Sequence, residues 1–540
     1  MKTHNYFKNV FAVLAYAILA ISMLVIAGCV DINDASVPSK AIAGKGDGFI
    51  VVAITGNTGQ VGQIESVQLL RVNRRPEQRD TIQVMRNVAS GLARDTALFV
   101  GIVPEGDYSL YQLNFGARYL LIAEGARKLM GDIHVKAGAV ADLGRVVMTP
   151  LNTSVLTGRS VIETTNSELV RRFSPENASI YEHEVSGGWI YPHSPRDLVE
   201  DYAMQRPVGA DTPAELASGE IIAASRLGTL LIRNVRGRWR AVRTGNLNSL
   251  LAVQPVRDGD VDGSPALAVA VGEFNTIAVL DRNEKLAIKQ SGNLPLGNVI
   301  YVAGNSKVGW FVAHKSADRV GIYRSTSLDN GNWSLLKEEK VGFSFWNGVN
   351  SFWTWSSSHG FAYATSEGVI RNYDYPTGVW VESHAPNNSR ISAIAVSDAG
   401  IGILTSPGGG FGGVFAGMYV SNDIGKSWIE IKSPYKVKLY APRVLSDGSL
   451  LVAGGGPFAK RELQRSSDKG KTWQVCSDKV DINDNIVPLP TQGTLAIDSG
   501  AQFGLAHIMH SADSGSTWAT EYSNFDLQAF EFEKQKKQSK

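Results

Sequence analysis

The chain has few cysteines and no excess of charge of either sign. Its 540 residues include 2 cysteines, and Cys29 stands at the end of an N-terminal apolar segment. Cys476 is therefore left without an intrachain partner, which excludes a scaffold held by disulfides. The 53 Lys and Arg residues nearly balance the 51 Asp and Glu residues. No overall field favours nucleic acid as a partner.

Glycine, in contrast, is abundant at 55 residues, while charged residues make up only 19% of the chain. This mixture is typical of many short strands joined by tight turns, so it predicts an all-β protein. A chain of this length exceeds one ordinary core, and two or three domains are expected.

Residues 1–28 have the pattern of a signal peptide. Lys2 and Lys8 precede an apolar run, and the run ends in Ile26-Ala27-Gly28-Cys29. Small residues before a cysteine resemble the lipobox of bacterial lipoproteins. The resemblance implies cleavage before Cys29 and a contact with the lipid bilayer through acylated Cys29, with palmitate among the acyl chains. An uncleaved anchor helix is the alternative.

Several acyl chains on one residue would give stable anchoring to a membrane. The residue after the cysteine is Val30 and not Asp. Under the enterobacterial sorting pattern this favours the outer membrane, so the expected location is the cell envelope.

A tether over residues 29–48 is expected to lead into a β-sandwich over residues 49–150. Runs such as 49–54 and 66–72 are rich in β-branched residues. The turn Pro104-Glu105-Gly106-Asp107-Tyr108 resembles those of transthyretin-like accessory sandwiches in bacterial envelope proteins. A connector with short helices, near 163–173 and 195–204, is expected over residues 151–215.

The strongest internal signal is an octad with the pattern S-x-D-x-G-x-[ST]-W. It occurs at 421–428, 466–473 and 511–518. The pattern resembles the Asp-box, or BNR repeat, of the β-propellers of sialidases, sortilin-type receptors and photosystem II assembly factors. We expect its aspartates to bind turn amides, its glycines to accept positive φ and its tryptophans to pack between sheets. These structural residues are Asp423, Gly425, Trp428, Asp468, Gly470, Trp473, Asp513, Gly515 and Trp518.

Degenerate copies of the octad extend the series upstream. The tryptophans at 333, 380, 428, 473 and 518 recur every 45 to 48 residues. The gap between Trp239 and Trp333 is twice this period, which places a hidden copy near Leu286. Seven units result, so residues 216–533 are predicted to form a seven-bladed β-propeller. A strand at Ala529–Glu533 is expected to close the ring on the first blade, and residues 534–540 form a basic tail.

In Asp-box propellers the box joins the third and fourth strands, and the ligand funnel lies on the opposite face. Projected onto this chain, the resemblance places aromatic and cationic residues on the funnel face, where they could stack and pair with a sugar or a peptide terminus. The candidate ligand-binding residues are Phe345, Trp346, Arg390, Lys436, Lys460 and Arg461. Trp353 and Trp355 are expected in the core between blades.

The loop 258–263 alternates acids with glycine in the manner of a calcium loop. Asp258, Asp260 and Asp262 are its candidate ligands, but Val269 stands where an EF-hand has its twelfth-position Glu. An ordinary solvated loop is the favoured interpretation, and no other cofactor or metal is expected.

These features favour a membrane-anchored lipoprotein whose propeller acts as a non-catalytic binding or assembly module for an envelope protein or glycan. The alternative is a glycoside hydrolase of the sialidase type. The chain lacks the Arg-Ile-Pro motif of sialidases, and no pair of carboxylates stands out as acid and nucleophile. No catalytic residue is therefore assigned.

Overall fold

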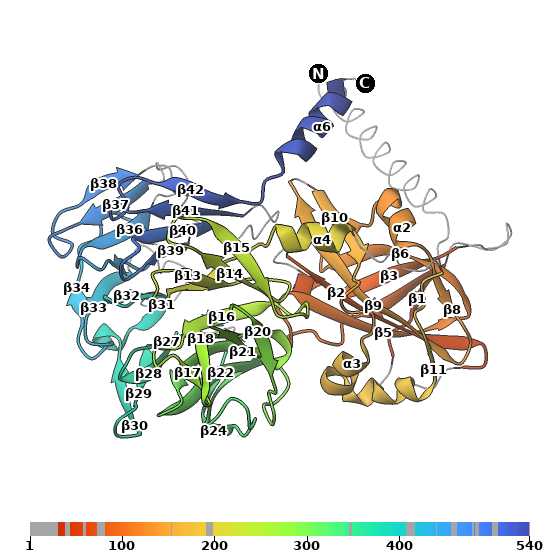
Figure 1. The fold of residues 1–540 in the computed structure, drawn as a ribbon, viewed down its shortest axis with the longest axis horizontal. Helices are drawn as coiled ribbons and strands as arrows, with labels where there is room; N and C mark the ends of the chain where they lie inside the picture. The colour runs from red at the N-terminus through yellow and green to blue at the C-terminus, as the bar shows by residue number, and fades with distance from the viewer. Residues whose placement is uncertain are drawn as a thin grey trace, which may run out of the picture.

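Two β-rich bodies lie side by side in the computed structural model (Figure 1). It describes residues 31–37, 44–57, 61–72, 81–152, 154–190, 198–344, 348–406, 416–438, 440–454, 462–477, 480, 485–498 and 506–538. The signal peptide and Cys29 lie outside these ranges. Among the described residues, no helix is both long enough and apolar enough to cross a membrane.

The N-terminal body is a β-sandwich, as predicted. Its first sheet has the order β1 (Asp31–Asp34), β4 (Thr81–Arg86), β3 (Ser66–Arg71), β6 (Gly106–Phe115) and β7 (Arg118–Leu121), with β8 (Ile133–Val135) paired to β6. The second has the order β10 (Ser154–Arg159), β9 (Ala139–Leu151), β2 (Asp47–Gly56) and β5 (Thr96–Pro104), with β11 (Glu184–Ser186) paired to β9.

Strand β2 is buried on both faces because it lies in the middle of three layers. Ile50, Val52 and Ile54 pack in the core between the two sheets. The alternate residues, including Phe49 and Val51, pack in a cluster with residues of α3 (Ser167–Phe173) and η2 (Pro175–Glu182). This explains why the run from 49 to 54 is continuously apolar and does not alternate.

Two domain boundaries differ from the prediction. Strand β1 lies inside the expected tether of 29–48 and pairs in parallel with β4. Strand β10 lies inside the expected connector of 151–215 and extends the second sheet by pairing with β9. The predicted helices correspond to α3 and to α4 (Leu198–Gln205), while α2 (Glu124–Met130) and η1 (Val61–Gln63) complete the body.

The second body is a β-propeller whose described strands form successive four-stranded antiparallel sheets. The first three sheets, here called blades 1 to 3, are β12 (Asp211–Glu215), β13 (Ile221–Ala224), β14 (Thr229–Arg233) and β15 (Trp239–Arg243); β16 (Leu250–Pro255), β18 (Ser264–Gly272), β19 (Ile277–Asp281) and β20 (Leu286–Lys289), with β17 (Asp260–Val261) on β18; and β21 (Asn298–Asn305), β22 (Gly309–Ser316), β23 (Arg319–Ser325) and β24 (Ser334–Lys340).

Four more sheets follow as blades 4 to 7. They are β27 (Phe352–Ser356), β28 (Gly360–Thr365), β29 (Val369–Asp374) and β30 (Val379–His384); β31 (Arg390–Ser397), β32 (Gly400–Ser406), β33 (Gly417–Ser421) and β34 (Ile429–Glu430); β35 (Arg443–Val444), β36 (Leu450–Gly454), β37 (Glu462–Ser466) and β38 (Gln474–Ser477); and β39 (Asn485–Pro488), β40 (Thr494–Asp498), β41 (His507–Ser511) and β42 (Ala519–Ser523). The hairpin β25 (Gly342–Ser344) and β26 (Gly348–Asn350) and the turns η3 (Glu273–Asn275) and η4 (Pro386–Asn388) lie between these strands. Blade 1 begins at β12, which falls within the predicted connector, so the boundary between connector and propeller also differs from the prediction.

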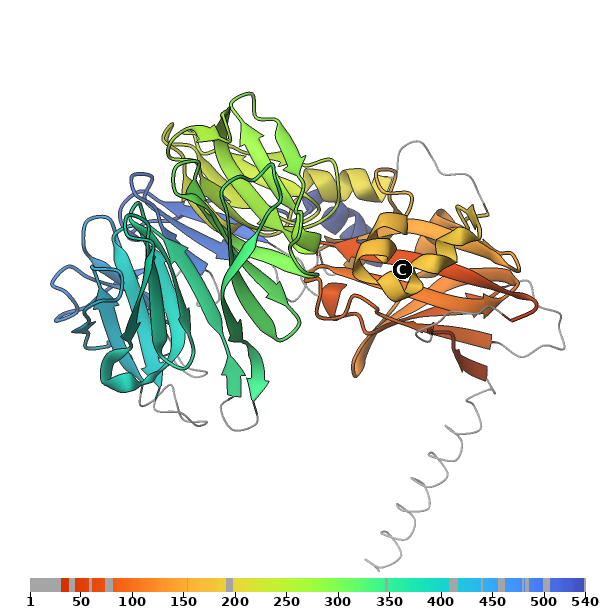
Figure 2. The same ribbon diagram turned by 90° about the horizontal axis from the view of Figure 1, so that it is seen from below.

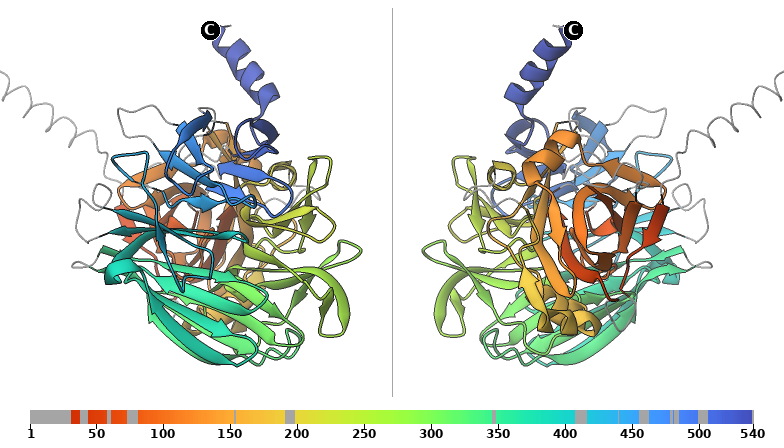
Figure 3. Two further views of the ribbon diagram at one scale, coloured as in Figure 1. Left: turned by 90° about the vertical axis from the view of Figure 1, so that its left-hand side faces the viewer. Right: turned by 90° about the vertical axis from the view of Figure 1, so that its right-hand side faces the viewer.

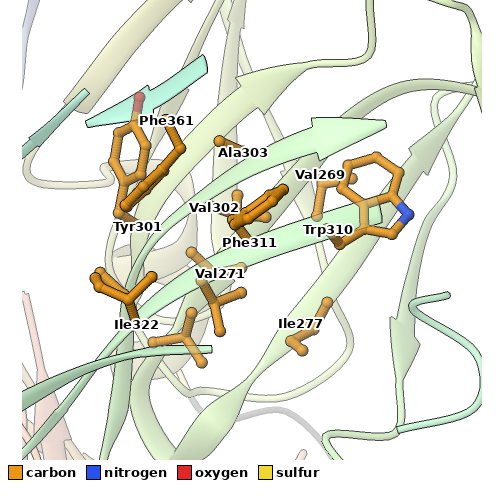
Figure 4. Packing of buried hydrophobic residues seen from close by; sticks show 14 of the residues in the cluster. Val269, Val271, Ile277, Tyr301, Val302, Ala303, Trp310, Phe311, Ile322 and Phe361 are labelled. Atoms are coloured by element: carbon orange, nitrogen blue, oxygen red, sulfur yellow. The ribbon is translucent and has the colours of Figure 1, made fainter. Parts of the chain in front are cut away.

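Aromatic side chains fill the core shared by blades 2, 3 and 4 (Figure 4). The Phe311 ring lies 5.9 Å from that of Phe361 and 5.0 Å from that of Tyr373, measured between centroids. Trp310 and Val269 belong to the same buried cluster. The cluster joins neighbouring blades, whose described strands do not pair with one another.

The three intact octads connect the third and fourth strands of blades 5, 6 and 7. In the second, the Ser466 hydroxyl donates to Asp468 Oδ1 at 2.8 Å, and Asp468 also accepts the Thr472 amide at 2.8 Å and the Thr472 hydroxyl at 2.6 Å. The same bonds recur at Asp423 and Asp513. The aspartates thus hold the turns.

The octad tryptophans of blades 6 and 7 pack toward the preceding blade. Trp473 of blade 6 donates its indole N–H to Lys432 O of blade 5 at 2.7 Å, and Trp518 of blade 7 joins a cluster with Leu451 and Leu463 of blade 6. Leu286 occupies the corresponding slot of blade 2, is 5% exposed and packs with residues of blade 1.

The ring closes without a shared strand in its described part. Residues 527–538 form the helix α6 (Leu527–Gln538), so the expected strand at Ala529–Glu533 is wrong, and the helix takes up most of the expected tail. Blades 7 and 1 are instead joined by side chains. Arg233 donates two hydrogen bonds to Glu521, both at 2.6 Å, and Trp239 Nε1 donates to the same carboxylate at 3.2 Å. We call this contact between blades 7 and 1 the seam.

Apolar residues complete the seam. Ile221, Ala223 and Leu231 of blade 1 pack with Leu495 and Ile497 of blade 7. At the end of β12, the Glu215 carboxylate accepts hydrogen bonds from the backbone amides at 491 and 492.

The sandwich docks on blades 1, 2 and 7, and α4, yellow in Figure 2, runs between the two bodies. Arg94 pairs with Asp211 at 3.0 Å, and Arg226 lies 3.4 Å from Asp95. Glu273 of blade 2 accepts the backbone amides of Arg94 and Asp95. In the view from the propeller end the sandwich lies behind the blades (Figure 3, left). Loss of one buried partner would leave an uncompensated charge, which favours a single docked arrangement.

Candidate ligand channel

The alternating strand direction defines two faces of the propeller. Loops between strands 1 and 2 and between strands 3 and 4 lie on one side of an antiparallel blade, and the other loops lie on the opposite side. The octads join strands 3 and 4, and we call their side the box face. The opposite side carries the residues that contact the sandwich, such as Glu273 and Asn248, and we call it the sandwich face.

A cavity of about 1010 Å³ occupies the centre of the ring. Residues of the first strand of every described blade line it, from Thr212 in β12 to Val487 in β39. Many of the lining residues lie at the ends of the first strands and in the turns that follow, such as Ser356–Ser358 and Val396–Asp398. The cavity therefore occupies the half of the channel next to the box face.

Three arginines line this cavity without an ion pair. Arg443, at the start of β35, is half-buried, and its guanidinium donates to the carbonyls of Ile486 at 3.2 Å and Ala441 at 2.9 Å. Within the described ranges no carboxylate pairs with Arg443, Arg257 or Arg282. Burial lowers the pKa of Arg443 to about 10. The site thus presents partly desolvated positive charge that a bound carboxylate would neutralise.

Aromatic groups surround these cations. The Tyr301 hydroxyl lies 3.1 Å from Ser356 Oγ, and burial raises the pKa of Tyr301 to about 12. Burial also raises the pKa of Tyr375, while the nearby Arg257 charge opposes the rise for both phenols. Three groups of these residues, Tyr375 Oη, Trp310 Nε1 and Trp355 Nε1, are buried and have no hydrogen-bond partner in the described structure. The cations of the lining are thus set among large aromatic side chains.

Carboxylates are scarce in the lining. Of the described lining residues, Glu215 and Asp398 carry one, and Glu215 already accepts the amides at 491 and 492. A tyrosine–glutamate pair does occur elsewhere, since the Tyr363 hydroxyl donates to Glu339 at 2.7 Å. Tyr363 is fully buried and is not part of the lining, so it cannot reach a substrate.

The cavity differs from the surface predicted on the funnel face. Arg390, at the start of β31, lies with its guanidinium 3.5 Å from Ser366 Oγ, and Lys436 is exposed between β34 and β35. Neither lines the cavity. Phe345, Trp346, Lys460 and Arg461 lie outside the described residues. That surface therefore stays a prediction, and the sandwich covers the same face at blades 1, 2 and 7.

The two expected core tryptophans have a second role. Trp355 is 3% exposed and packs with Ile370 and Ile403, while Trp353 is half-buried against the same cluster. Both also line the cavity. Sequence reasoning missed Arg443 and Tyr301 because neither belongs to an aromatic or basic run. Their place in the first strand of a repeat was the available signal, since first strands surround the central channel of a propeller.

The acidic loop 258–263 makes intramolecular contacts. Asp262 Oδ2 accepts the amides of Leu328 at 2.6 Å and Asp329 at 3.0 Å, and Asp260 Oδ1 accepts the Gly263 amide at 3.1 Å. In the part of the chain that the structure describes, no group of three or more His, Cys, Asp or Glu residues is placed to hold a metal ion. Calcium binding at Asp258, Asp260 and Asp262 stays a prediction without a supporting geometry.

The fold and the cavity define a class, an accessory β-sandwich joined to a β-propeller with a cationic, aromatic channel. No family model and no curated protein matches the chain. Among solved structures, the one described as "YCF48 bound to D1 peptide" is 17% identical and is matched over 57% of this chain and 94% of its own, with a TM-score of 0.40.

Two further solved structures are similar over the same extent. A computationally designed protein, Ika8, is 10% identical over 60% of this chain and 90% of its own, with a TM-score of 0.35. A putative 6-phosphogluconolactonase from Bacteroides fragilis is 10% identical over 58% of this chain and 92% of its own, with a TM-score of 0.38. At these identities the similarities carry no information on the ligand.

Proposed function

We propose that this chain is a lipid-anchored, non-catalytic binding protein of the bacterial cell envelope, held at the outer membrane, whose channel takes an anionic, carboxylate-bearing ligand. The observation that carries the proposal is Arg443, a half-buried guanidinium in the cavity with no carboxylate partner among the described residues. A ligand carboxylate can accept two parallel hydrogen bonds from one guanidinium. An acidic protein segment and an acidic glycan both offer this group.

The composition of the lining supports binding without turnover. Glycoside hydrolysis needs two carboxyl groups that flank one bond, as acid and as base or nucleophile. Of the two carboxylates among the described lining residues, Glu215 is already held by backbone amides of blade 7. The described lining residues therefore do not offer the pair of free carboxyl groups that a hydrolase would use.

Anisotropy with a fluorescent oligoglutamate peptide and with an oligogalacturonate, at low salt, tests the channel. We expect Arg443→Met to weaken binding about tenfold or more, because hydrogen bonds to charged groups contribute about 1.5–3 kcal/mol. Arg257→Ser, at an exposed lining position, should weaken binding without affecting folding. An oligoglutamine peptide is the neutral control.

The matched control variant is Arg465→Met. Arg465 pairs with Asp447 at 2.6 Å and lies outside the lining, so its loss should leave affinity unchanged. Equal binding by wild type, Arg443→Met and Arg257→Ser would refute the channel as the site. Release of monosaccharide from the galacturonate probe by purified protein would favour the hydrolase instead.

Anchoring has a separate test. The apolar run that ends in Ile26-Ala27-Gly28-Cys29 supports acylation of Cys29. Cys29→Ser should leave an unprocessed precursor or release the protein from membranes. An unmodified Cys29 in the mature wild-type protein, by mass spectrometry, would disprove this part of the proposal.

A further inference from the structure

The sandwich begins almost at the proposed lipid anchor. Strand β1 starts at Asp31, two residues after Cys29, and pairs along its length with β4. Two residues span at most about 7 Å even when fully extended. If Cys29 carries the lipid, as proposed above, the end of the sandwich at Asp31 lies next to the membrane.

Strand pairing shows which end of the sandwich this is. Strand β1 pairs with β4 from Asp31↔Thr81 onward, and the bridge between Ser36 and Gly101 places it antiparallel to β5. Asp31 therefore lies toward the Pro104 end of β5. The first residue of β2, Asp47, pairs with Pro104 at the same end. We call this the anchor end of the sandwich.

The propeller is attached at the opposite end of the same strand. Just before β5 begins at Thr96, Arg94 pairs with Asp211, and Asp95 with Arg226. Strand β5 has 9 residues, so the anchor end and the docking end are about 30 Å apart. Figure 1 shows this order, with β8 at the end of the sandwich far from the blades.

The propeller meets the sandwich with its sandwich face, so the box face points away from the anchor end. Strand β21, which lines the channel, adds 8 residues or about 26 Å between the two faces. The mouth of the channel thus lies roughly 55 Å from the lipid along the molecule.

We infer that the anchored protein holds its channel mouth away from the membrane, and that the ligand is a water-soluble anionic macromolecule. The inference rests on the proposed anchoring at Cys29 and on the channel as binding site. A segment embedded in the anchoring membrane would have to extend past the sandwich and, to enter by the box face, past the propeller as well before it could reach Arg443.

Energy transfer to a lipid acceptor measures the orientation. The lipidated full-length protein, with Cys476→Ser, is placed in liposomes that contain an acceptor-labelled lipid. A donor dye is attached at Lys471→Cys on the box face or at Lys45→Cys near the anchor end, both exposed positions. We expect transfer from Lys45→Cys to exceed that from Lys471→Cys about fivefold or more, given their separation along the molecule.

Binding to the liposomes supplies a second readout. An oligoglutamate peptide added outside should bind the anchored protein as tightly as it binds the detergent-solubilised protein. Equal transfer from both dyes, or an affinity reduced tenfold by anchoring, would overturn the inference and point to a ligand in the same membrane. Failure of the wild type to float with liposomes would overturn it together with the anchoring, while binding measured in detergent would still support the channel.

Discussion

Blades 3 and 6 are built from strands of different length. The four strands of blade 3 have 8, 8, 7 and 7 residues, whereas those of blade 6 have 2, 5, 5 and 4. Blade 3 lies in a large cluster that includes Phe311, Trp310 and Trp333, and blade 6 contributes to small clusters of mostly aliphatic residues. Blade 6 carries an intact octad and blade 3 a degenerate one.

The difference extends to the neighbouring blades. Blades 5 and 7 have the same serine–aspartate–hydroxyl arrangement as blade 6. In blade 2 the aspartate is kept, since Asp281 Oδ1 accepts the amides of Asn283 and Lys285, but the two hydroxyl partners are absent. Hydrogen-bonded turns and a large apolar core are thus alternative ways to stabilise a blade. Short strands need the turn bonds because they pair along fewer residues.

Loss of the Phe311 ring, which lies in the aromatic core shared by blades 2, 3 and 4, should reduce stability most. Phe311→Ala empties a site between blades 3 and 4, and we expect it to lower the free energy of unfolding by about 3–5 kcal/mol, as for other buried phenylalanines. Denaturant unfolding measures this change. Phe311→Leu is the control and should cost much less. A loss below about 1 kcal/mol for the alanine variant would mean that this core does not hold the blades.

The seam should respond next, and its response depends on pH. Hydrogen bonds from Arg233 and His510 hold the pKa of Glu521 at about 2, below its usual value, despite partial burial. The carboxylate therefore contributes stability above about pH 4.3, the unfolded value, and the contribution is lost as pH falls through about 2. Glu521→Gln should lose about 2 kcal/mol near pH 6 and show a flatter decline below pH 4.

His510 adds the opposite dependence at the seam. Its hydrogen bond with Glu521 raises the pKa of the imidazole, so its contribution is complete below about pH 6.5 and is lost as pH rises through the folded-state value. Thermal unfolding from pH 3 to pH 9 should thus show a maximum between pH 4.3 and 6.5 that Glu521→Gln removes. An unchanged profile in that variant would show that the seam does not limit unfolding.

Two turn variants test whether an intact octad stabilises its blade more than a degenerate turn does. Asp423→Ala removes three hydrogen bonds from an intact octad and should cost about 1–2 kcal/mol. Asp281→Ala removes two amide contacts from the degenerate turn of blade 2 and should cost about half as much. Chemical denaturation of both proteins measures the difference. Equal losses would mean that the hydroxyl partners of the octad add nothing.

The smallest effect is expected on the outer strands. Leu335 of blade 3 and Val475 of blade 6 are 51% and 55% exposed. Threonine at either position should change the free energy of unfolding by less than about 0.5 kcal/mol, because little apolar area is lost from the core. A large loss at Val475 alone would show that blade 6 depends on its outer strand and not on its turn.

The repeat period made most of the propeller predictable from sequence. Leu286 was placed in a tryptophan slot from spacing alone, and the structure buries it there at the start of β20. The spacing predicts this burial because each blade packs against its neighbour in the same way. The strand at Ala529–Glu533 failed for the complementary reason. The contact that closes the ring occurs only once among the described blades, so it leaves no repeated pattern in the sequence. The ion pair of Arg233 and Glu521 takes the place of the expected strand.

The sandwich boundaries and the channel were harder to predict. Strand β1 is short, polar and exposed at Ile32, so its sequence carries no strand pattern, and pairing with β4 alone defines it. The channel residues come from first strands that are far apart in sequence. Arg443 and Tyr301 meet only because the blades surround one axis, which no local pattern records. The octads were correctly predicted to form turns, but the cavity next to the box face was not predicted.

The seam also determines when the propeller ring can close during folding. Arg233 and Glu521 are 288 residues apart, and Asn152 of the sandwich bonds to Asp526, 374 residues away. Contacts of such separation form late and slow folding. A nascent chain that lacks its last thirty residues retains the octads of blades 5 and 6 but has an open ring, exposed to proteases and aggregation. Synthesis of blade 7 as far as Asp526 is therefore the step at which a correctly made molecule becomes distinguishable from a truncated one.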